Sequence, residues 1–268
     1  MERLLARVSV SPHADRFLLK GALLFALWYD APHRPTRDAD LLGFGPDDEA
    51  HLIATFREIA TMDLGDGVVF DPDSVKARAI REHDAYGGSR VTLVARIGSA
   101  RCALQIDVGF GDAVTPGPQT VAYPSLLGDF PTSTLRVCPV YTVIAEKYQA
   151  MVMLGQANSR MKDFFDLSVI ARRTALDGTT LAAAIAATFA RRRTGLPTER
   201  PLALTRGFSE DTAKLRQWQA FLGRNRLAAA GLGDTVELLD KLLWLPTQGA
   251  GSSSQLNATW SPGALRWG

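Results

Sequence analysis

The pattern of apolar and polar positions changes once along the chain. Short runs with partial alternation predict strands up to about residue 138, and apolar positions three or four apart predict helices from Tyr141 onward. The predicted strands are 17–19, 37–44, 68–70, 74–80, 90–97 and 101–110. Turn residues at 84–88 and 98–99 separate three of these runs, so the middle of the chain is predicted to form an antiparallel meander.

Helical patterns precede this meander and then take over after it. The predicted helices are 22–29, 46–61, two within 141–171, 180–193, 211–227 and 235–245. Apolar stripes at helical spacing usually pack into a core, so we assign them structural roles. We therefore predict an α+β fold in three parts: an α+β core at 1–138, a helical domain at 139–247, and a Gly- and Ser-rich tail at 248–268. The tail is expected to be flexible except at Trp260 and Trp267, whose side chains could dock on the rest of the protein.

Composition adds a charge asymmetry to this picture. Residues 1–150 contain 15 Lys/Arg and 19 Asp/Glu, whereas residues 151–230 contain 13 and 6. The acidic half suits cations and the basic half suits phosphates, although arginine-rich helix faces that only meet water give the same pattern. Because the sequence contains neither a signal peptide nor an apolar run of membrane-spanning length, we expect a cytoplasmic protein with no membrane partner.

The cysteines and histidines argue against two kinds of site. Cys102 and Cys138 form neither a metal-ligand spacing nor a disulfide framework, so we expect both thiols in the core of a protein from a reducing compartment. The four histidines lie far apart, without the spacing of zinc ligands. The sequence also lacks a Walker-type phosphate loop and a Gly-x-Ser-x-Gly nucleophile elbow.

Three aspartates in predicted strands point to metal chemistry. Asp38 and Asp40 are two positions apart, so both carboxylates lie on one face of a strand and repel each other unless a cation joins them. Asp107 alternates with apolar residues in another strand, and if the two strands are neighbours it becomes a third carboxylate. Three carboxylates with substrate phosphates can hold two Mg²⁺ ions for attack on a phosphoryl centre. Acids in solvated loops or at strand ends are the plain alternative.

Other residues suit a phosphate. Lys20-Gly21-Ala22 precedes a predicted helix, where a glycine lets backbone N–H groups approach a phosphate closely. Lys147 lies on the first helix of the basic half, and the next helix carries Lys162, Asp163 and Asp166. Its two acids are three residues apart and share a face. An acid there would orient a lysine or accept a proton from an attacking hydroxyl, and a salt-bridged helix face is the alternative.

Taken in order, these segments resemble the AbiEii/AbiGii-type toxin nucleotidyltransferases, which include the MenT-like toxins. The resemblance covers about residues 17–170, and its motifs are specific as a set rather than singly. The matching stretches are Lys20-Gly21-Ala22, Arg34-Pro35-Thr36-Arg37-Asp38-Ala39-Asp40, Ile106-Asp107-Val108-Gly109, Glu146-Lys147 and residues 160–167. The chain departs from the family pattern at Ala22, where glycine or serine is more usual, so backbone groups must contact the phosphate without a side-chain hydroxyl.

The resemblance implies a polymerase-β-like nucleotidyltransferase core with a helical C-terminal part. It also implies Mg²⁺-dependent transfer of a nucleotide from an NTP to the 3′ end of tRNA, by a toxin paired with a cognate antitoxin. On this mapping the metal ligands are Asp38, Asp40 and Asp107, and the catalytic residues are Asp38, Asp40, Lys147 and Asp163. The nucleotide-binding residues are Lys20, Gly21, Ala22, Lys147 and Lys162, while Asp166 has a capping or structural role.

Three functions stay open on the sequence. A toxin acting on tRNA would use its basic helices to hold the RNA backbone, through Arg160, Arg172, Arg173 and Arg191–Arg193. A small-molecule nucleotidyltransferase of the antibiotic-modifying type would share the core but need no extended basic surface. A binding module without catalysis would not depend on the metal ligands.

Thr36 suggests a means of regulation. It lies two residues before Asp38 and shares its predicted face, so a phosphate on Thr36 would add negative charge beside the metal ligands. We therefore consider Thr36 a site of inactivating phosphorylation by a partner. A β-branched residue that simply suits a strand is the alternative.

Overall fold

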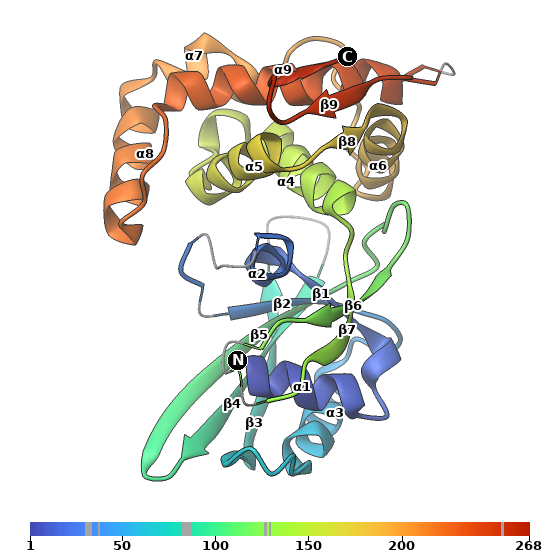
Figure 1. The fold of residues 1–268 in the computed structure, drawn as a ribbon, viewed down its shortest axis with the longest axis vertical. Helices are drawn as coiled ribbons and strands as arrows, with labels where there is room; N and C mark the ends of the chain where they lie inside the picture. The colour runs from blue at the N-terminus through green and yellow to red at the C-terminus, as the bar shows by residue number, and fades with distance from the viewer. Residues whose placement is uncertain (30–33, 37, 82–86, 126–127, 129, 253–254) are drawn as a thin grey trace. The chain divides into compact units, whose positions relative to one another are not determined.

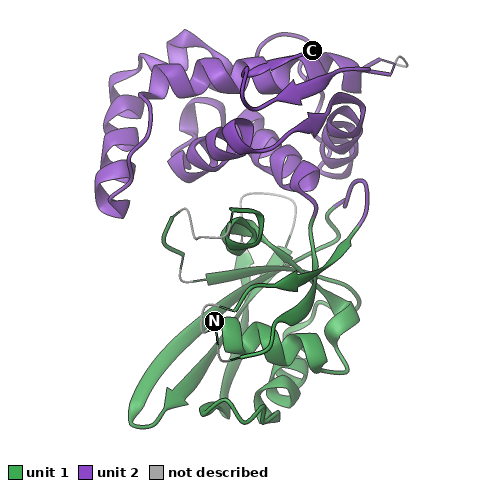
Figure 2. Ribbon diagram, viewed as in Figure 1, with its two compact units in different colours: residues 1–112, 118–138 green, residues 113–117, 139–268 purple. Residues whose placement is uncertain are grey.

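The structure is a computed structural model (Figure 1), and it describes residues 1–29, 34–36, 38–81, 87–125, 128, 130–252 and 255–268. Arg37 at the start of a predicted strand, residues 84–86 of a predicted turn, His33 and His83 lie outside the described residues. The described chain divides into two compact units (Figure 2), one of residues 1–112 with 118–138 and one of residues 113–117 with 139–268. The first is built on a sheet and the second on helices, so the predicted mixed fold with a helical C-terminal part is confirmed.

Over the described residues, the first unit contains a seven-stranded sheet in the order β3-β4-β5-β2-β1-β7-β6. The strands are β1 (Phe17–Lys20), β2 (Asp38–Gly43), β3 (Val68–Arg81), β4 (Gly87–Ile97), β5 (Ala100–Phe110), β6 (Gln119–Tyr123) and β7 (Ser133–Val137). β3, β4 and β5 form the predicted antiparallel meander, and β2 joins β5 in parallel. β1 then pairs antiparallel with β2 and parallel with β7, which pairs antiparallel with β6.

The two longer helices of the first unit cover one face of this sheet. These are α1 (Glu2–Val10) and α3 (Glu49–Thr61), and the shorter α2 (Leu24–Tyr29) follows β1 after a 3₁₀ turn at Gly21–Leu23. The ring of Phe17 on β1 contacts that of Phe56 on α3, with centroids 5.5 Å apart. Leu19, Ala39 and Leu41 point the same way as Phe17 and are almost fully buried. These side chains belong to the apolar core beneath α1 and α3, while Leu18 and Leu42 are buried on the other face, which also bears Asp38 and Asp40.

A buried ion pair fastens α1 to the segment before β3. The side chains of Arg7 and Asp66 are almost fully buried, and the Arg7 guanidinium donates to the two Asp66 carboxylate oxygens at 2.7 and 2.9 Å. Arg7 also donates to the Met62 and Val68 carbonyls, and Arg3 adds a bond to Asp66. Hydrogen bonds from Arg7 above all, joined by Arg3, hold the pKa of Asp66 far below its usual range against the opposing effect of burial.

The second unit is mainly helical. Its helices are α4 (Val140–Leu154), α5 (Met161–Arg173), α6 (Gly178–Arg191), α7 (Arg206–Ser209), α8 (Thr212–Asn225) and α9 (Leu232–Ala250). The stripes predicted on α4 and α5 are core positions, since Ile144, Tyr148, Phe164 and Leu167 are fully buried. α6 and α8 are capped by the preceding Asp177 and Asp211, whose side chains accept hydrogen bonds from backbone N–H groups of the first turn.

The C-terminal segment is built into the second unit. Where the sequence predicts a flexible tail at 248–268, α9 extends to Ala250, and β9 (Thr259–Ser261) and β10 (Arg266–Trp267) join β8 (Leu176–Asp177) in a small sheet. Trp260 is fully buried, and its indole N–H donates to the Ala171 carbonyl at 2.7 Å. The buried Trp260 and the hydrogen bonds of the Trp267 indole to the carbonyls of α9 attach this segment to the unit.

The two thiols differ in exposure, which corrects the prediction that both are core residues. Cys138 is buried, but Cys102 is exposed. Cys102 lies in the first part of β5, where residues 100–103 are all exposed, so this end of the meander extends beyond the core. No helix among the described residues combines the length and apolar character that a membrane crossing requires.

Candidate active site

Asp38 and Asp40 occupy the face of β2 opposite the one that Ala39 and Leu41 share. Both are half-buried, while Ala39 and Leu41 between and beyond them are buried on the opposite face. β5 lies beside β2, and its register places Asp107 opposite Asp40. On the other side, β1 places Lys20 opposite Asp40. The strand pairing thus brings three aspartates and a lysine to one face of the sheet.

Gly21 lies directly against the Asp40 carboxylate. Its φ is +73°, in the left-handed region that favours glycine. A Cβ added there would fall 2.0 Å from Asp40 Oδ2 and 2.7 Å from Asp40 Cγ. Two independent restrictions, backbone conformation and close approach, therefore require glycine at this position. Ala22 follows within the 3₁₀ turn and is buried.

Lys20 is held beside these carboxylates by a further acid. Its Nζ lies 2.8 Å from Asp112 Oδ2, and both side chains are largely buried. Asp112 follows β5 in sequence, 92 residues from Lys20. The sequence did not identify Asp112, and its position two residues after the end of β5 was the only indication available.

Asp107 is bound by an arginine of the neighbouring strand. Arg90 on β4 is its register partner and makes two bonds of 2.8 Å, from Nε to Oδ1 and from Nη2 to Oδ2. Gln105 Nε2 lies 3.5 Å from Oδ1. A paired guanidinium satisfies both carboxylate oxygens, so in this structure Asp107 is bound to Arg90.

The residues on β2 suit a magnesium ion. Mg²⁺ is usually held by one or two carboxylates and completes its coordination with water and substrate phosphates, and Asp38 and Asp40 provide such a pair. Because Gly21 has no side chain, the Asp40 carboxylate can lie directly against its backbone. The described residues contain no group of three or more His, Cys, Asp or Glu side chains placed to hold a metal. The observed geometry therefore fits a two-carboxylate site of Asp38 and Asp40, because Asp107 is bonded to Arg90.

Thr36 precedes β2 and turns its hydroxyl toward that strand. Thr36 Oγ1 donates to the Asp38 carbonyl at 3.2 Å, and the residue is half-buried. The bond ties Thr36 to the backbone of the residue that bears the first carboxylate. A group added to this oxygen would remove the bond and occupy space next to Asp38.

A second cluster of candidate residues lies in the helical unit. Lys147 on α4 places Nζ 2.6 Å from Asp163 Oδ1 and 2.8 Å from Asp166 Oδ2, both on α5. Arg160 Nε donates to the second Asp163 oxygen at 2.8 Å. The side chains of both aspartates are at most 1% exposed and that of Lys147 is 12% exposed. Asp166 thus lies inside α5 as a partner of Lys147, and the N-cap is Arg160.

The lysine and the aspartates of this cluster affect one another's pKa values. Burial disfavours the ammonium of Lys147, but Asp163 and Asp166 outweigh it and raise the pKa of Lys147 above its usual value. Burial likewise disfavours ionised Asp163, but Lys147 and Arg160 outweigh it and lower the pKa of Asp163. At neutral pH Lys147 is therefore protonated and Asp163 is ionised. Lys162, its neighbour in sequence, is exposed on α5.

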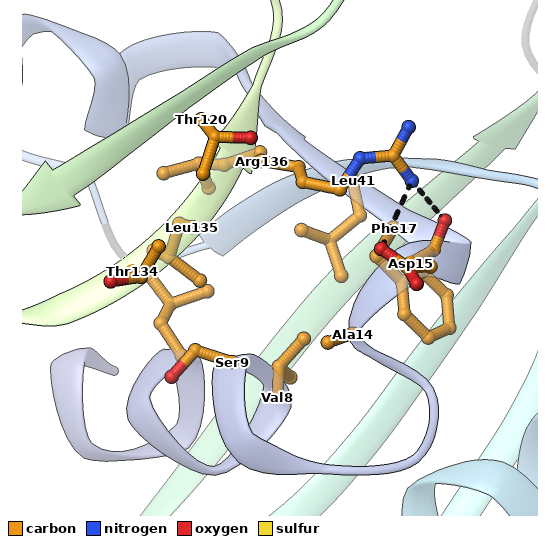
Figure 3. Close-up of a pocket in the computed structure, with 12 residues that line it drawn as sticks. Val8, Ser9, Ala14, Asp15, Phe17, Leu41, Thr120, Thr134, Leu135 and Arg136 are labelled. Carbon is orange, nitrogen blue, oxygen red and sulfur yellow. Dashed lines mark hydrogen bonds and ion pairs between the residues drawn. The ribbon is translucent and has the colours of Figure 1, made fainter.

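The opposite face of the first unit's sheet contains a cavity of about 590 Å³ (Figure 3). Apolar side chains such as Leu19, Leu41 and Leu135 form much of its lining, and Arg136 contacts the Asp15 backbone carbonyl at its rim. Because Leu19 and Leu41 alternate with Lys20 and Asp40, the sheet separates this cavity from the carboxylates. The cavity lining contains one carboxylate, Asp15, so we exclude it as the metal site.

Comparisons with known proteins bear on this arrangement. The sequence matches the model of one protein family, described as nucleotidyl transferase AbiEii toxin, type IV TA system, over residues 3–231. No curated protein matches the chain.

Two solved structures from Helicobacter pylori are similar to this one. JHP933 is 14% identical, with a TM-score of 0.51 over 93% of this chain and 90% of its own. A protein assigned to the nucleotidyltransferases is also 14% identical, with a TM-score of 0.51 over 95% of each chain. At this identity the similarity shows a shared fold, and the chemistry must be argued from the residues themselves.

Proposed function

Because the chain belongs to the AbiEii nucleotidyl transferase toxin family of type IV toxin–antitoxin systems, we propose that it transfers a nucleotide from an NTP to the 3′ end of tRNA in a Mg²⁺-dependent reaction. The chain is a nucleotidyltransferase, and its family implies a nucleotide substrate and a cognate antitoxin. One observation carries the proposal: Asp38 and Asp40 share a face of β2, and the Asp40 carboxylate lies directly against Gly21, which has no side chain to displace it. Because the NTP donor and the tRNA acceptor are both found in the cytoplasm, the reaction would take place there.

The proposed reaction is a substitution at the α-phosphorus of the NTP. The terminal ribose hydroxyl forms the new P–O bond, its proton is lost to solvent, and the bond to pyrophosphate breaks. When bound, Mg²⁺ would supply charge neutralisation of the phosphates. Asp38 and Asp40 would hold it, and Asp107 would join them once freed from Arg90. The protein contributes mainly position and fixed charge.

The phosphate-binding roles follow from fixed positive charge. Lys20 would contribute charge beside Asp40, and the backbone of Gly21 and Ala22 would approach a phosphate. Lys147, protonated and held by Asp163 and Asp166, would contact the triphosphate, and Lys162 would add an exposed charge on the same unit.

Asp163 acts through Lys147 in this proposal. A carboxylate whose pKa is lowered by two cations is a weak proton acceptor, so a role as general base is disfavoured. Its bonds to Lys147 and Arg160 instead fix where the ammonium lies. We therefore assign Asp163 an orienting role.

The direct test is transfer of labelled nucleotide. Purified protein is incubated with total tRNA, Mg²⁺ and each labelled NTP in turn, alongside Asp38→Asn, Asp40→Asn and the control Asp73→Asn, whose side chain is exposed on β3. We expect each β2 variant to lose roughly 10²–10³-fold in rate, the scale of one lost electrostatic contact to the transition state. Full activity in both would refute metal catalysis at these residues. Label on a small hydroxyl compound but not on RNA would instead indicate the antibiotic-modifying class.

Thr36 is proposed as an inactivating phosphorylation site. A phosphate would replace the hydroxyl that donates to Asp38 and bring roughly two negative charges beside the metal ligands. Thr36→Glu should therefore lose transfer activity, whereas Thr36→Val, which removes only the hydroxyl, should keep most of it. Full activity of Thr36→Glu would refute the proposal.

A further inference from the structure

Positively charged side chains occupy the outer strands on the same sheet face as the aspartates. Register pairs Asp107 with Arg90, Arg90 with Arg78, and Arg101 with Arg96. Alternation along β3 and β4 adds Lys76 and Thr92 to this face. We call Lys76, Arg78, Arg90, Arg96 and Arg101 the cationic face. It spans β3, β4 and β5, beginning where the carboxylates end.

Most of this charge is exposed and unneutralised. Lys76, Arg78, Arg96 and Arg101 are exposed, and Arg90 is half-buried. Arg90 is paired with Asp107, and Arg96 lies 4.0 Å from Asp71. Among the described residues, Lys76, Arg78 and Arg101 have no ion-pair partner. The core side of these strands has the opposite character, with Val91, Leu93, Leu104 and Ile106 buried.

The cationic face also contains unfavourable pairs. Arg78 lies directly opposite Arg90, and Arg96 lies directly opposite Arg101. Like charges at directly opposed positions destabilise a sheet, by amounts similar to the 0.2–1 kcal/mol that opposite charges contribute. Asp107 pairs with Arg90 and Asp71 lies near Arg96, so each like-charge pair is partly offset, and an anion between its members would relieve the repulsion that is left. Adjacent strands are about 4.8 Å apart, so a row of phosphates would contact guanidinium groups from more than one strand.

We infer that the cationic face binds the phosphate backbone of the acceptor RNA. This inference rests on the proposed function, and it places a binding surface in the N-terminal unit in addition to the arginines predicted on the basic helices. RNA phosphates would lie along β3, β4 and β5 beside Asp107, while Asp38 and Asp40 would hold the metal. Backbone contacts of this kind give affinity without sequence selectivity.

Binding of tRNA in the absence of NTP tests the inference. The variant Arg78→Gln/Arg101→Gln removes one member of each opposed pair, and the matched control Arg57→Gln/Arg266→Gln removes two exposed charges elsewhere. Affinity for labelled tRNA is measured over a range of KCl concentrations. Each lost phosphate contact lowers the salt slope by about 0.7–0.9, so we expect a decrease of about 1.4–1.8 in the variant and none in the control.

Two further measurements separate binding from folding and from catalysis. The variant should unfold at the wild-type temperature or slightly above it, since each substitution relieves a repulsion. In the transfer assay it should raise the KM for tRNA and leave the KM for NTP unchanged.

An unchanged salt slope in the variant, or an equal decrease in the control, would overturn the inference, as would wild-type protein that binds no tRNA. A wild-type protein that binds tRNA through this face but transfers no nucleotide would support the surface and refute the proposed function. The two failures are therefore distinguishable.

Discussion

At the scale of single residues, Gly21 offers the sharpest test of the site. Gly21→Ala places a methyl group in the left-handed region and against Asp40, whereas Gly65→Ala has the same backbone strain, with φ of +63° and no atom within 4 Å. Strain alone costs about 1–2 kcal/mol in either variant. We expect both to unfold at lower temperature, but only Gly21→Ala to lose most of its transfer activity. Equal activity in the two variants would show that Asp40 tolerates displacement.

The side chains that bind the site residues were the hardest part of the site to predict from the sequence. The alternation of β2 identified Asp38 and Asp40, because a strand places residues two apart on one face. Arg90 and Asp112 were missed, although they bind Asp107 and Lys20. Each lies on a different strand or loop from its partner, so only the sheet register could reveal the contact. Asp163 and Asp166 were recognised as sharing a face because both lie on one helix.

At the scale of elements, the Arg7–Asp66 pair should make the first unit sensitive to acid. Because the pKa of Asp66 is lowered, its carboxylate contributes full stability above about pH 5, and this contribution is lost progressively as the pH falls through the unfolded value of about 4 toward the lower folded value. Asp66→Asn leaves Arg7 buried without its charge partner and should cost roughly 3–5 kcal/mol at neutral pH. The difference in urea midpoint between wild type and Asp66→Asn should shrink toward pH 3. Exposed Asp73→Asn is the control, and a pH-independent difference would contradict the assignment.

The C-terminal segment compensates for a proline inside α9. Pro246 has no N–H to donate to the Leu242 carbonyl four residues earlier, and the indole of Trp267 donates to that carbonyl at 3.2 Å and to Lys241 at 3.1 Å. Trp267→Phe should therefore cost about 1 kcal/mol. The same change should cost less in a Pro246→Ala background, where the helix supplies its own donor. A double-mutant cycle by urea unfolding measures the difference, and equal costs would rule out this compensation.

The same proline explains why helix boundaries were harder to predict than helices. The sequence ends this helix at Leu245 because proline normally stops one, but Pro246 is buried and α9 continues to Ala250. Tertiary packing and the Trp267 bond outweigh the local preference. The strands of the meander were predicted well, since each has its own turn residues and buried alternate positions.

At the scale of the whole molecule, the candidate residues are divided between the two units, and so is the positive charge. Asp38, Asp40 and Asp107 belong to the first unit, while Lys147 and Asp163 belong to the second. Counting charge along the sequence pointed only to the helices, because the cationic face lies within a half of the chain that is acidic overall. Sheet register, which no composition reveals, gathers that charge on one face.

Both basic regions are expected to contribute to RNA affinity. Arg172→Gln/Arg193→Gln removes two exposed charges from the helical unit. We expect its salt slope for tRNA to fall by about 1.4–1.8, and that of the variant combining it with Arg78→Gln/Arg101→Gln to fall by about twice as much. An unchanged slope for the helical variant would exclude these arginines from the contact.

The contrast between the two cysteines has a practical consequence. With Cys138 enclosed in the core and Cys102 exposed on β5, a maleimide dye should react at one position of the native protein without any engineering. Cys102 neighbours Arg101, so the dye would sit at the end of the meander that carries the cationic face. Quenching of its fluorescence as tRNA is added would then follow RNA association in real time, with the wild-type sequence intact.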